Sequence, residues 1–345
     1  MAAPPAVVSE VLRDYGALVR GALREYLPAA EPQRYLYDLV ADYPGRGGKM
    51  MRPSLCIAVA RALGAPLDRL LVAAATSIEL MHNAMLVHDD IEDESDRRRG
   101  KPTLHNLWGV AMAINAGDAL AVSSLRPLLG AAAYAPPQLA LSLLQETEHM
   151  ARESAEGQAL ELGWRAENVI ALEDRDYFEM VLKKTCWLAT IHPVRLGALI
   201  AVAGRVDPGA FVRFGFFLGA AFQIQDDVLN LVGDEAAYGK ESDGDLREGK
   251  RTLLIIRLLQ LATADERRRL VAHLGTPLPE RRGDEVRWIR DRMDHYGCIA
   301  YARQVAHAMA GAALDEYARL FAPVPASRDR AFVEGLITWV VERTG

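Results

Sequence analysis

Few cysteines and few sheet-forming runs limit what this 345-residue sequence can be. Its three cysteines, Cys56, Cys186 and Cys298, are odd in number and show no Cys-x-x-Cys spacing. We therefore expect reduced, mostly buried thiols in a cytoplasmic protein rather than a disulfide framework. No segment alternates cleanly between apolar and polar residues between turns, which argues against β-strands.

Long uncharged apolar runs and an excess of positive charge are also missing. No stretch approaches about 18 uncharged apolar residues, so we expect no integral membrane segment. Residues 1–10 lack the basic start and the long apolar run of a signal peptide. The formal net charge of -6 argues against a nucleic-acid partner.

Lysine is scarce as well, since 34 of the 40 basic residues are arginines. In a chain biased toward arginine, a retained lysine indicates a place where a compact ammonium is needed and a planar guanidinium does not fit. The six lysines are Lys49, Lys101, Lys183, Lys184, Lys240 and Lys250.

Leu, Ala, Glu and Arg dominate the composition, and this predicts an all-α protein. Nothing forces a division, so we expect a single domain over residues 1–345. A helix should begin near Pro53, and the polar stretch 234–249 should be a mobile loop. Further helices are predicted over residues 6–26, 67–93, 104–130, 137–162, 173–191, 208–232, 251–262, 280–295, 297–321 and 328–342.

The first acidic motif, Asp89-Asp90-Ile-Glu-Asp93, ends the predicted helix over 67–93. Residues four apart on a helix lie about 40° apart around its axis, so Asp89 and Asp93 share a face and Asp90 lies close by. Carboxylates this close repel one another, and a divalent cation relieves the repulsion. A solvated acidic helix end is the alternative, but residues 84–88 before the motif are mostly apolar.

A second acidic motif, Asp226-Asp227-Val-Leu-Asn230, follows another mostly apolar run over 214–224. Two such motifs can face each other across a helical bundle, with room for a diphosphate between them. Mg²⁺ prefers a few carboxylates together with phosphate oxygens and water, and bound ions can clamp a departing diphosphate. The pair therefore predicts a multi-metal diphosphate site.

Basic residues surround these motifs in the sequence. Lys49 and Arg52 lie three apart at a loop-to-helix junction, where free backbone N–H groups favour anions. The arginine triplet 97–99 follows the first motif, Lys184 and Thr185 lie between the two motifs, and Lys240 and Lys250 follow the second. A solvated turn is the usual explanation of an arginine triplet, but four of the six lysines fall within or beside such segments.

In this order and spacing, the motifs over about residues 47–343 resemble the trans-type polyprenyl diphosphate synthase family, and geranylgeranyl diphosphate synthases within it. The resemblance implies an isoprenoid-synthase helical bundle around a central diphosphate and prenyl cavity, and a homodimer. It implies three Mg²⁺ ions per active site, with Asp89, Asp93 and Asp226 as metal ligands. The substrates would be isopentenyl diphosphate and an allylic diphosphate.

The resemblance also assigns binding residues, which we keep as expectations. His82, otherwise an ordinary core histidine, becomes a diphosphate ligand. The residues expected to bind isopentenyl diphosphate are Lys49, Arg52, His82 and Arg99. Those expected to bind the allylic diphosphate are Arg98, Lys184, Thr185, Gln223, Lys240 and Lys250. The expected catalytic residues are Asp89, Asp90, Asp93, Asp226, Asp227, Lys184 and Lys240.

Two positions depart from the family pattern. Asn230 stands where the family often has a third aspartate, and its amide cannot supply a charge although its oxygen can hold a metal-bound water. Glu161 stands where the family has the aspartate of Gly-Gln-x-x-Asp, in Gly157-Gln-Ala-Leu-Glu161. The longer acid keeps the charge and moves it by one methylene.

The implied reaction ionises the allylic diphosphate to a carbocation, which the double bond of isopentenyl diphosphate attacks before a proton is lost. Product length would be set one and two helical turns below Asp89, at Met81, Ala84 and Met85, because a turn of about 5.4 Å is close to one isoprene unit. None of the three is aromatic, so we expect twenty-carbon geranylgeranyl diphosphate, although ordinary core methionines are the alternative.

Other functions remain open on the sequence alone. A longer-chain polyprenyl diphosphate synthase would share every motif. A terpene cyclase of the same fold needs no second diphosphate site, so the cations expected to bind isopentenyl diphosphate argue against it. A non-catalytic synthase subunit would show degraded motifs, and Asn230 is the candidate for that.

Overall fold

Helices make up nearly all the regular structure of the described part of the chain, which in this computed structural model comprises residues 6–27, 30–202, 207–233 and 243–343. The prediction of an all-α protein is confirmed. The described strands are two-residue segments, β1 (Arg97–Arg98) and β2 (Lys101–Pro102), which pair antiparallel directly after the first acidic motif.

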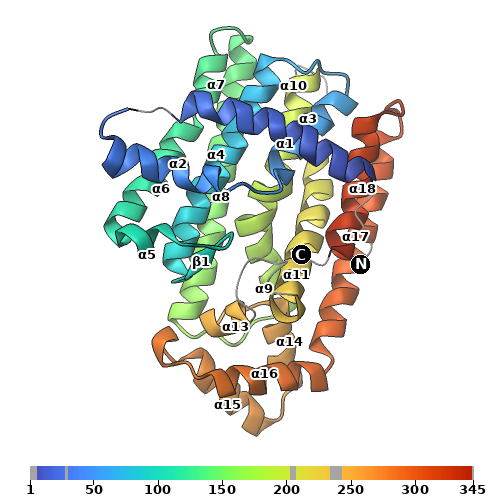
Figure 1. The fold of residues 1–345 in the computed structure, drawn as a ribbon. Coiled ribbons are helices and arrows are strands. Elements are labelled where there is room, and N and C mark those ends of the chain that lie inside the picture. Colours follow the sequence, from blue (N-terminus) through green and yellow to red (C-terminus); the bar gives the residue numbers. More distant parts are fainter. Residues whose placement is uncertain (1–5, 28–29, 203–206, 234–242, 344–345) are drawn as a thin grey trace.

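The bounds of the helices follow the predicted order (Figure 1). The longer α-helices are α1 (Ala6–Tyr26), α3 (Met51–Ala62), α4 (Arg69–Glu92), α6 (Val110–Ser124), α8 (Pro137–Ala166), α10 (His192–Val202), α11 (Val212–Val232), α15 (Ala264–Leu274), α16 (Gly283–His295), α17 (Cys298–Phe321) and α18 (Arg328–Glu342). The shorter elements are η1 (Gln33–Tyr37), α2 (Asp38–Gly45), α5 (Leu104–Trp108), α7 (Arg126–Ala131), α9 (Asp174–Val181), η2 (Leu182–Ile191), η3 (Pro208–Phe211), α13 (Gly244–Glu248), α14 (Leu253–Leu261) and η4 (Leu278–Glu280).

Helix α4 lies inside the bundle and carries the first acidic motif at its C-terminal end. The side chain of Asp68 caps its start by accepting a hydrogen bond of 3.0 Å from the backbone N–H of Leu71. Helices α1, α3 and α6 pack on it, and buried residues occur on all sides of it. In Figure 1, α4, α8 and α11 run along the length of the molecule, and α1 crosses them near one end. A helix apolar on all sides belongs in a core.

The same helix bears on the expectation that the chain has no integral membrane segment. Over its 24 residues, α4 is long and apolar enough to cross a membrane by composition alone. The protein interior, however, buries 78% of the apolar window. This is the environment of a core helix, so length and hydropathy here reflect packing within the bundle.

Two glycines let neighbouring helices come close to η2, the segment that holds Lys184 and Thr185. A Cβ atom added at Gly157 of α8 would lie 2.1 Å from the backbone nitrogen of Lys184. A Cβ atom added at Gly219 of α11 would lie 2.8 Å from Sγ of Cys186. Because no side chain can be placed at those distances, glycine is required for both approaches.

The structure divides some of the predicted helices. Residues 104–130 form three helices rather than one, with Gly109 at a φ of 84° between the first two. Residues 182–191 wind as a π-helix, which hydrophobic periodicity does not reveal. Helices α2 and α15 were not predicted, although Thr263 and Glu266 form a capping box that marks the start of α15. The cysteines are free and buried, as expected.

Candidate active site

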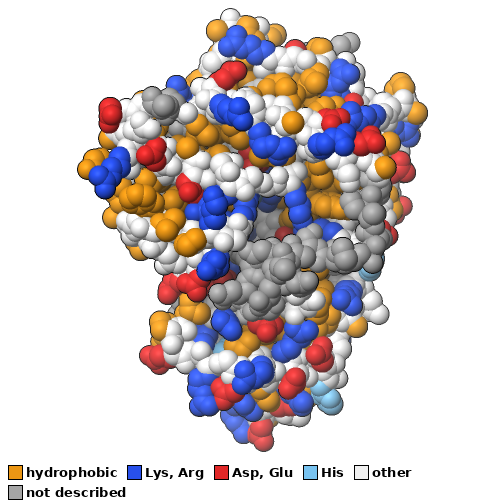
Figure 2. All heavy atoms as spheres, in the orientation of Figure 1, with side chains coloured by type: hydrophobic (Ala, Val, Ile, Leu, Met, Phe, Trp, Pro, Cys, Tyr) orange, Lys and Arg blue, Asp and Glu red, His pale blue; other side chains and the backbone are white. Residues whose placement is uncertain are grey.

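Both acidic motifs face one cavity, of about 550 Å³. Walls from α4, α8, α9, η2 and α11 enclose it, and the segment after α13 closes one side. Lys and Arg side chains gather around the hollowed middle of the face shown in Figure 2. The predicted residues that line this cavity are Lys49, Arg52, His82, Met85, Asp89, Arg98, Arg99, Lys184, Thr185, Gln223, Asp226, Asp227 and Lys250.

The π-helix η2 directs Lys184 and Thr185 into the cavity. Nζ of Lys184 lies 2.6 Å from Oε1 of Glu161 and 3.4 Å from Oδ1 of Asp89. Burial alone would lower the pKa of Lys184, but these two carboxylates outweigh it and raise that pKa. Glu161, the departure noted in the sequence, therefore keeps the ammonium charged beside the first motif.

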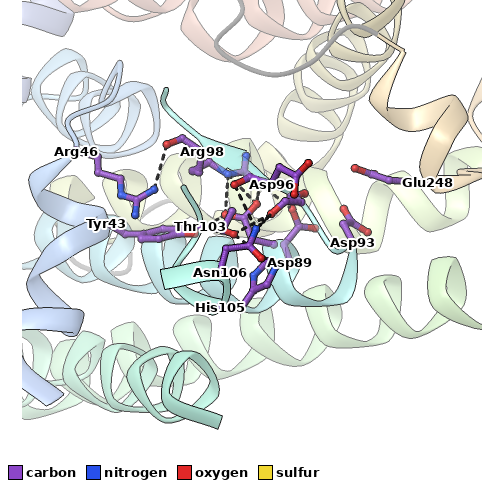
Figure 3. A network of polar contacts seen from close by, with 12 residues as sticks. Tyr43, Arg46, Asp89, Asp93, Asp96, Arg98, Thr103, His105, Asn106 and Glu248 are labelled. Atoms are coloured by element: carbon purple, nitrogen blue, oxygen red, sulfur yellow. Dashed lines mark hydrogen bonds and ion pairs between the residues drawn. The ribbon is translucent and has the colours of Figure 1, made fainter. Parts of the chain in front are cut away.

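Asp90 is fully buried and is held by two groups from other segments. The hydroxyl of Tyr43 donates a hydrogen bond of 2.6 Å to Oδ2 of Asp90. Nε of Arg98 lies 3.0 and 3.1 Å from the two carboxylate oxygens. Figure 3 shows Tyr43 and Arg98 on one side of the motif, with Arg46 donating to the carbonyl of Arg98 at 3.1 Å. Asp90 thus fixes Arg98 at the cavity wall and does not itself line the cavity.

Asp93 caps the end of α4 and lies apart from that group, on the side of Glu248 (Figure 3). Its oxygens lie 2.6 Å from Nη1 of Arg165 and 2.7 Å from Nζ of Lys250. Lys250 also lies 2.7 Å from Oε2 of Glu248. Burial alone would raise the pKa of Asp93, but the positive charges of Lys250 and Lys184 more than offset that effect. The pKa of Asp93 therefore falls below its usual range.

The second motif has a matching arrangement at Asp227. The hydroxyl of Tyr177 donates a hydrogen bond of 2.7 Å to Oδ2, and Nε2 of Gln223 donates one of 2.8 Å to Oδ1. Thr185 donates in turn to Oε1 of Gln223 at 2.9 Å. Burial, with Asp245 adding repulsion, raises the pKa of Asp227 well above its usual value.

Asn230 anchors the short helix α13 rather than facing the cavity. Its Oδ1 accepts a hydrogen bond of 3.0 Å from the backbone N–H of Asp245, and its carbonyl oxygen accepts one of 2.9 Å from the N–H of Asp243. Asp245 and Lys250, which follow, line the cavity. Asn230, where this chain departs from the family motif, therefore supports the segment that carries Lys250.

A second cavity, of about 370 Å³, adjoins the first. Burial lowers the pKa of Arg52 to about 10, which leaves its guanidinium charged at neutral pH. Burial and the neighbouring arginines lower the pKa of His82 well below its usual range, so its imidazole is neutral there. The residues shared by the two cavities are Lys49, Arg52, His82, Arg99, Phe222 and Arg343.

The acidic side chains that an ion can reach are the first of each motif. Side chains of Asp89 and Asp226 are each 24% exposed, whereas those of Asp90 and Asp93 are 0% exposed. The described residues contain no preformed group of three or more metal-ligating side chains. Mg²⁺ does not need one, because it takes one or two carboxylates and completes its octahedron with phosphate oxygens and water. The donor set therefore fits Mg²⁺ bound together with a diphosphate.

Some predicted residues lie elsewhere. Lys240 is outside the described residues, as is most of the expected loop over 234–249, whose described end forms α13. Met81 and Ala84 are buried and do not line the main cavity, unlike Met85. Four further residues contact an aspartate of the two motifs and were not predicted from the sequence: Tyr43, Tyr177, Arg165 and Arg343.

Curated relatives match over most of this chain. A short chain isoprenyl diphosphate synthase of Methanothermobacter thermautotrophicus is 34% identical over 302 residues, which cover 87% of this chain and 88% of that protein. A geranylfarnesyl diphosphate synthase of Aeropyrum pernix is 31% identical over 322 residues, covering 90% and 98%.

Solved structures agree with the fold. The geranylgeranyl pyrophosphate synthetase of Pyrococcus horikoshii superposes with a TM-score of 0.84 at 33% identity, over 97% of this chain and 98% of that one. The geranylgeranyl pyrophosphate synthase of Corynebacterium glutamicum, complexed with isoprenyl diphosphate and magnesium, gives a TM-score of 0.84 at 25% identity, over 97% and 99%. The expected isoprenoid-synthase bundle is thereby confirmed.

The sequence profile of one family covers the larger part of this chain. That family is described as polyprenyl synthetase, and its profile matches residues 33–290. The chain belongs to the polyprenyl synthetase family and is a prenyltransferase.

Proposed function

We propose that this prenyltransferase condenses isopentenyl diphosphate with an allylic diphosphate to give all-trans geranylgeranyl diphosphate. One observation carries the proposal: two adjoining cavities share a cationic wall, and only the larger is lined by both acidic motifs. An enzyme that joins two diphosphates needs two such sites. A cyclase, which ionises one diphosphate, would leave the second without a use.

The larger cavity is the site for the allylic diphosphate. Mg²⁺ held by Asp89, Asp93 and Asp226, as three ions, would supply Lewis-acid stabilisation of the departing diphosphate. Asp93 is buried and does not line this cavity, so it has to exchange its guanidinium and ammonium partners before it can hold an ion there. The Corynebacterium glutamicum structure, which is complexed with isoprenyl diphosphate and magnesium, supports this assignment.

The chain's own cations would complete that site. Arg98 is fixed by Asp90, Lys184 is kept charged by Glu161, and Lys250 lines the cavity beside Asp93. As the allylic C–O bond breaks, its electron pair leaves with the diphosphate, and these cations stabilise the added negative charge. Thr185 and Gln223 orient the same wall through their hydrogen bond. Lys240 is assigned to the same diphosphate on the motif alone.

The smaller cavity is the site for isopentenyl diphosphate. Lys49, Arg52 and Arg99 supply charge, and neutral His82 can donate one N–H to a phosphate oxygen. The double bond then attacks the allylic carbocation to form the new carbon–carbon bond. Loss of one proton, to the departing diphosphate, restores the double bond. Because both substrates are bound side by side, the bimolecular step becomes effectively unimolecular. The apolar walls of the cavity exclude water from the carbocation.

Product length depends on the apolar part of the larger cavity. Met85 lines it together with Met180, Val181 and Leu188, and no aromatic residue stands at Met85. Growth beyond fifteen carbons is therefore open, and a methionine of intermediate size favours a stop at twenty. The names of the relatives support both twenty-carbon and longer products, with a geranylfarnesyl diphosphate synthase among them.

The chain would act as a single-domain homodimer in the cytoplasm. One core cluster includes residues from α1 through α18, which supports a single domain. An exposed apolar surface runs over α5 and α6 and is visible at the left of Figure 2, which supports a partner there. Its residues are Leu107, Trp108, Val110, Ile114 and Val122. The free, buried cysteines suit a reducing compartment.

Product analysis tests this function directly. The purified protein is incubated with Mg²⁺, isopentenyl diphosphate and dimethylallyl, geranyl or farnesyl diphosphate in turn, and products are identified by mass. We expect elongation of at least one starter, with twenty carbons as the main end point. Elongation should vanish in Asp89→Ala and persist in Asp265→Ala, which changes an exposed aspartate of α15. Failure of every starter would reject the function, and a longer end point would reject only the assigned length.

A further inference from the structure

Arg343 follows α18 and lies against the second acidic motif. One of its Nη atoms donates to Oδ1 of Asp226 at 2.6 Å and to the carbonyl oxygen of Phe222 at 3.1 Å. Nε2 of Gln225 donates to the carbonyl oxygen of Arg343 at 3.0 Å. Backbone and guanidinium are therefore both fixed on the segment of α11 that presents the proposed metal ligand.

The position of the guanidinium places it between the two substrate sites. Its Cζ atom lies 4.1 Å from the ring centroid of Phe222 and 5.9 Å from that of Trp339. Nζ of Lys49 lies 5.6 Å from the same Trp339 ring. Arg343 lines both cavities, and its side chain is only 5% exposed. A cation this enclosed, beside another cation, needs an anion close by.

The smaller cavity has an excess of positive charge. After burial, repulsion from Arg343 is the next cause that lowers the pKa of Lys49. Acidic residues among its lining are limited, within the described residues, to Glu79. The cationic residues that line it are Arg46, Lys49, Arg52, Arg99 and Arg343. In this arrangement Asp226 balances the charge of Arg343 from the neighbouring cavity.

We propose, building on the function proposed above, that Arg343 is a further ligand of isopentenyl diphosphate and that Asp226 holds it back until the metal site fills. A divalent ion on Asp226 repels a guanidinium on the same carboxylate. Arg343 then turns to the anion in the cavity that it already lines. Metal binding at Asp226 thereby strengthens the binding of isopentenyl diphosphate in the smaller cavity. Linkage requires that bound isopentenyl diphosphate strengthens metal binding by the same factor.

This assignment differs from a structural role in what it predicts. If Arg343 only held α18 in place, its replacement would lower the stability of the fold and weaken the binding of both substrates equally. A ligand released by metal binding should affect isopentenyl diphosphate selectively, and mainly when the metal site is occupied. One charge-assisted hydrogen bond is worth about tenfold in affinity, so the effects are measurable.

Calorimetric titration with isopentenyl diphosphate provides the test. It is run with and without Mg²⁺ and S-farnesyl thiodiphosphate, an allylic analogue that ionises slowly. For the unmodified protein we expect binding about tenfold tighter with the analogue and metal present. In Arg343→Gln this gain should disappear, while affinity without metal changes less than about twofold. Arg343→Lys, which keeps the charge, should retain part of the gain.

A matched control and a converse variant complete the experiment. Arg328→Gln removes an arginine from the other end of the same helix, paired with Asp14 at 2.5 Å, and should leave the titration unchanged. Asp226→Asn removes the carboxylate that restrains Arg343, so isopentenyl diphosphate should bind about tenfold tighter without metal. That prediction does not depend on whether Arg343→Gln folds.

Kinetics give a second reading. Arg343→Gln should raise KM for isopentenyl diphosphate about tenfold and leave KM for the allylic substrate within about twofold. Equal losses for both substrates, or an Asp226→Asn affinity no tighter than that of the unmodified protein, would overturn the assignment. If the unmodified protein binds no isopentenyl diphosphate at all, the proposed function fails instead.

Discussion

The hydroxyl of Tyr177 donates a 2.7 Å hydrogen bond to Asp227, the second aspartate of the second acidic motif. Tyr43 makes the corresponding bond of 2.6 Å to Asp90 of the first motif. Each motif thus has one aspartate fixed by a buried tyrosine from another element, and a more exposed one beside it that lines the cavity. The two aspartates of a pair therefore differ in role. The second is held by the tyrosine and fixes the local geometry of the motif, and the first is the one that an ion can reach.

Tyr177→Phe should therefore impair metal use without removing any metal ligand. The hydrogen bond is lost, Asp227 becomes freer to rotate, and the neighbouring Asp226 is less well positioned. Loss of a supporting hydrogen bond of this kind costs about 10- to 100-fold in metal affinity or activity. Activity measured against Mg²⁺ concentration should show a raised requirement, while Tyr35→Phe, at a site 62% exposed, should behave as the unmodified protein does. An unchanged magnesium curve would contradict this orienting role.

The sequence predicts the acidic motifs well because their chemistry is local. Asp89 and Asp226 follow apolar helical runs, and the structure puts both at one cavity. The roles of Tyr43 and Tyr177 could not be predicted from the sequence, because nothing in the sequence around a buried tyrosine shows which distant carboxylate it contacts. Arg343 is hidden for the same reason, being 117 residues from Asp226 in the chain.

Fold prediction shows the same division between local and distant causes. The ends of α1 and α18 agree with the predicted ranges. The side chain of Ser327 marks the start of α18 locally, because it accepts a hydrogen bond from the backbone N–H of Arg330. The π-helix around Lys184 was not predicted, because it depends on how closely α8 and α11 approach at Gly157 and Gly219. Tertiary packing decides such windings, and a single-sequence pattern does not contain it.

Asp93 should contribute to stability in a pH-dependent way when no metal is present. Since its pKa is lowered in the folded protein, its contribution is complete above the unfolded value of 3.8 and is lost as pH falls through the folded value. Asp93→Asn leaves Arg165 and Lys250 without this carboxylate, and should lower the free energy of unfolding at pH 7 by about 3 kcal/mol.

Urea unfolding in EDTA at pH 7, 5 and 3.5 measures this difference. The difference in free energy of unfolding between the unmodified protein and Asp93→Asn should be the same at pH 7 and pH 5, and should shrink only at pH 3.5. Asp265→Asn, whose side chain is 85% exposed, should show no comparable loss at any of them. A difference that stays the same down to pH 3.5, or that grows as the pH falls, would mean that the pKa of Asp93 is not lowered in the folded protein.

Asn230 should be a support for α13 rather than a weakened metal ligand. Asn230→Ala removes the acceptor for the Asp245 N–H, and we expect activity to fall about tenfold through misplacement of Lys250. Asn230→Asp keeps an oxygen at that position and should retain most of the activity. Initial rates at saturating Mg²⁺ compare the two. If the aspartate variant alone were active and the unmodified protein inert, the chain would be a non-catalytic subunit.

The apolar surface over α5 and α6 should mediate dimerisation. Val110 is 51% exposed and Ile114 is 43% exposed, one helical turn apart on α6. Val110→Asp would place a charge in the buried interface and should convert the dimer into a monomer. Sedimentation velocity reports the mass, with Leu67→Asp, a change at an exposed leucine outside α5 and α6, as the control. A monomer already in the unmodified protein would show that this surface serves another purpose.

Product length gives the sharpest test of the cavity, because Met85 lines it and Met81, one turn earlier on α4, does not. Met85→Phe places a ring in the path of the growing chain and should shift the end point from twenty to fifteen carbons. Met81→Phe overpacks a buried position, which should cost about 1–3 kcal/mol of stability while leaving the product length unchanged. Mass analysis of the products separates the two outcomes. Shortening by Met81→Phe alone would mean that the chain grows along a different face of α4.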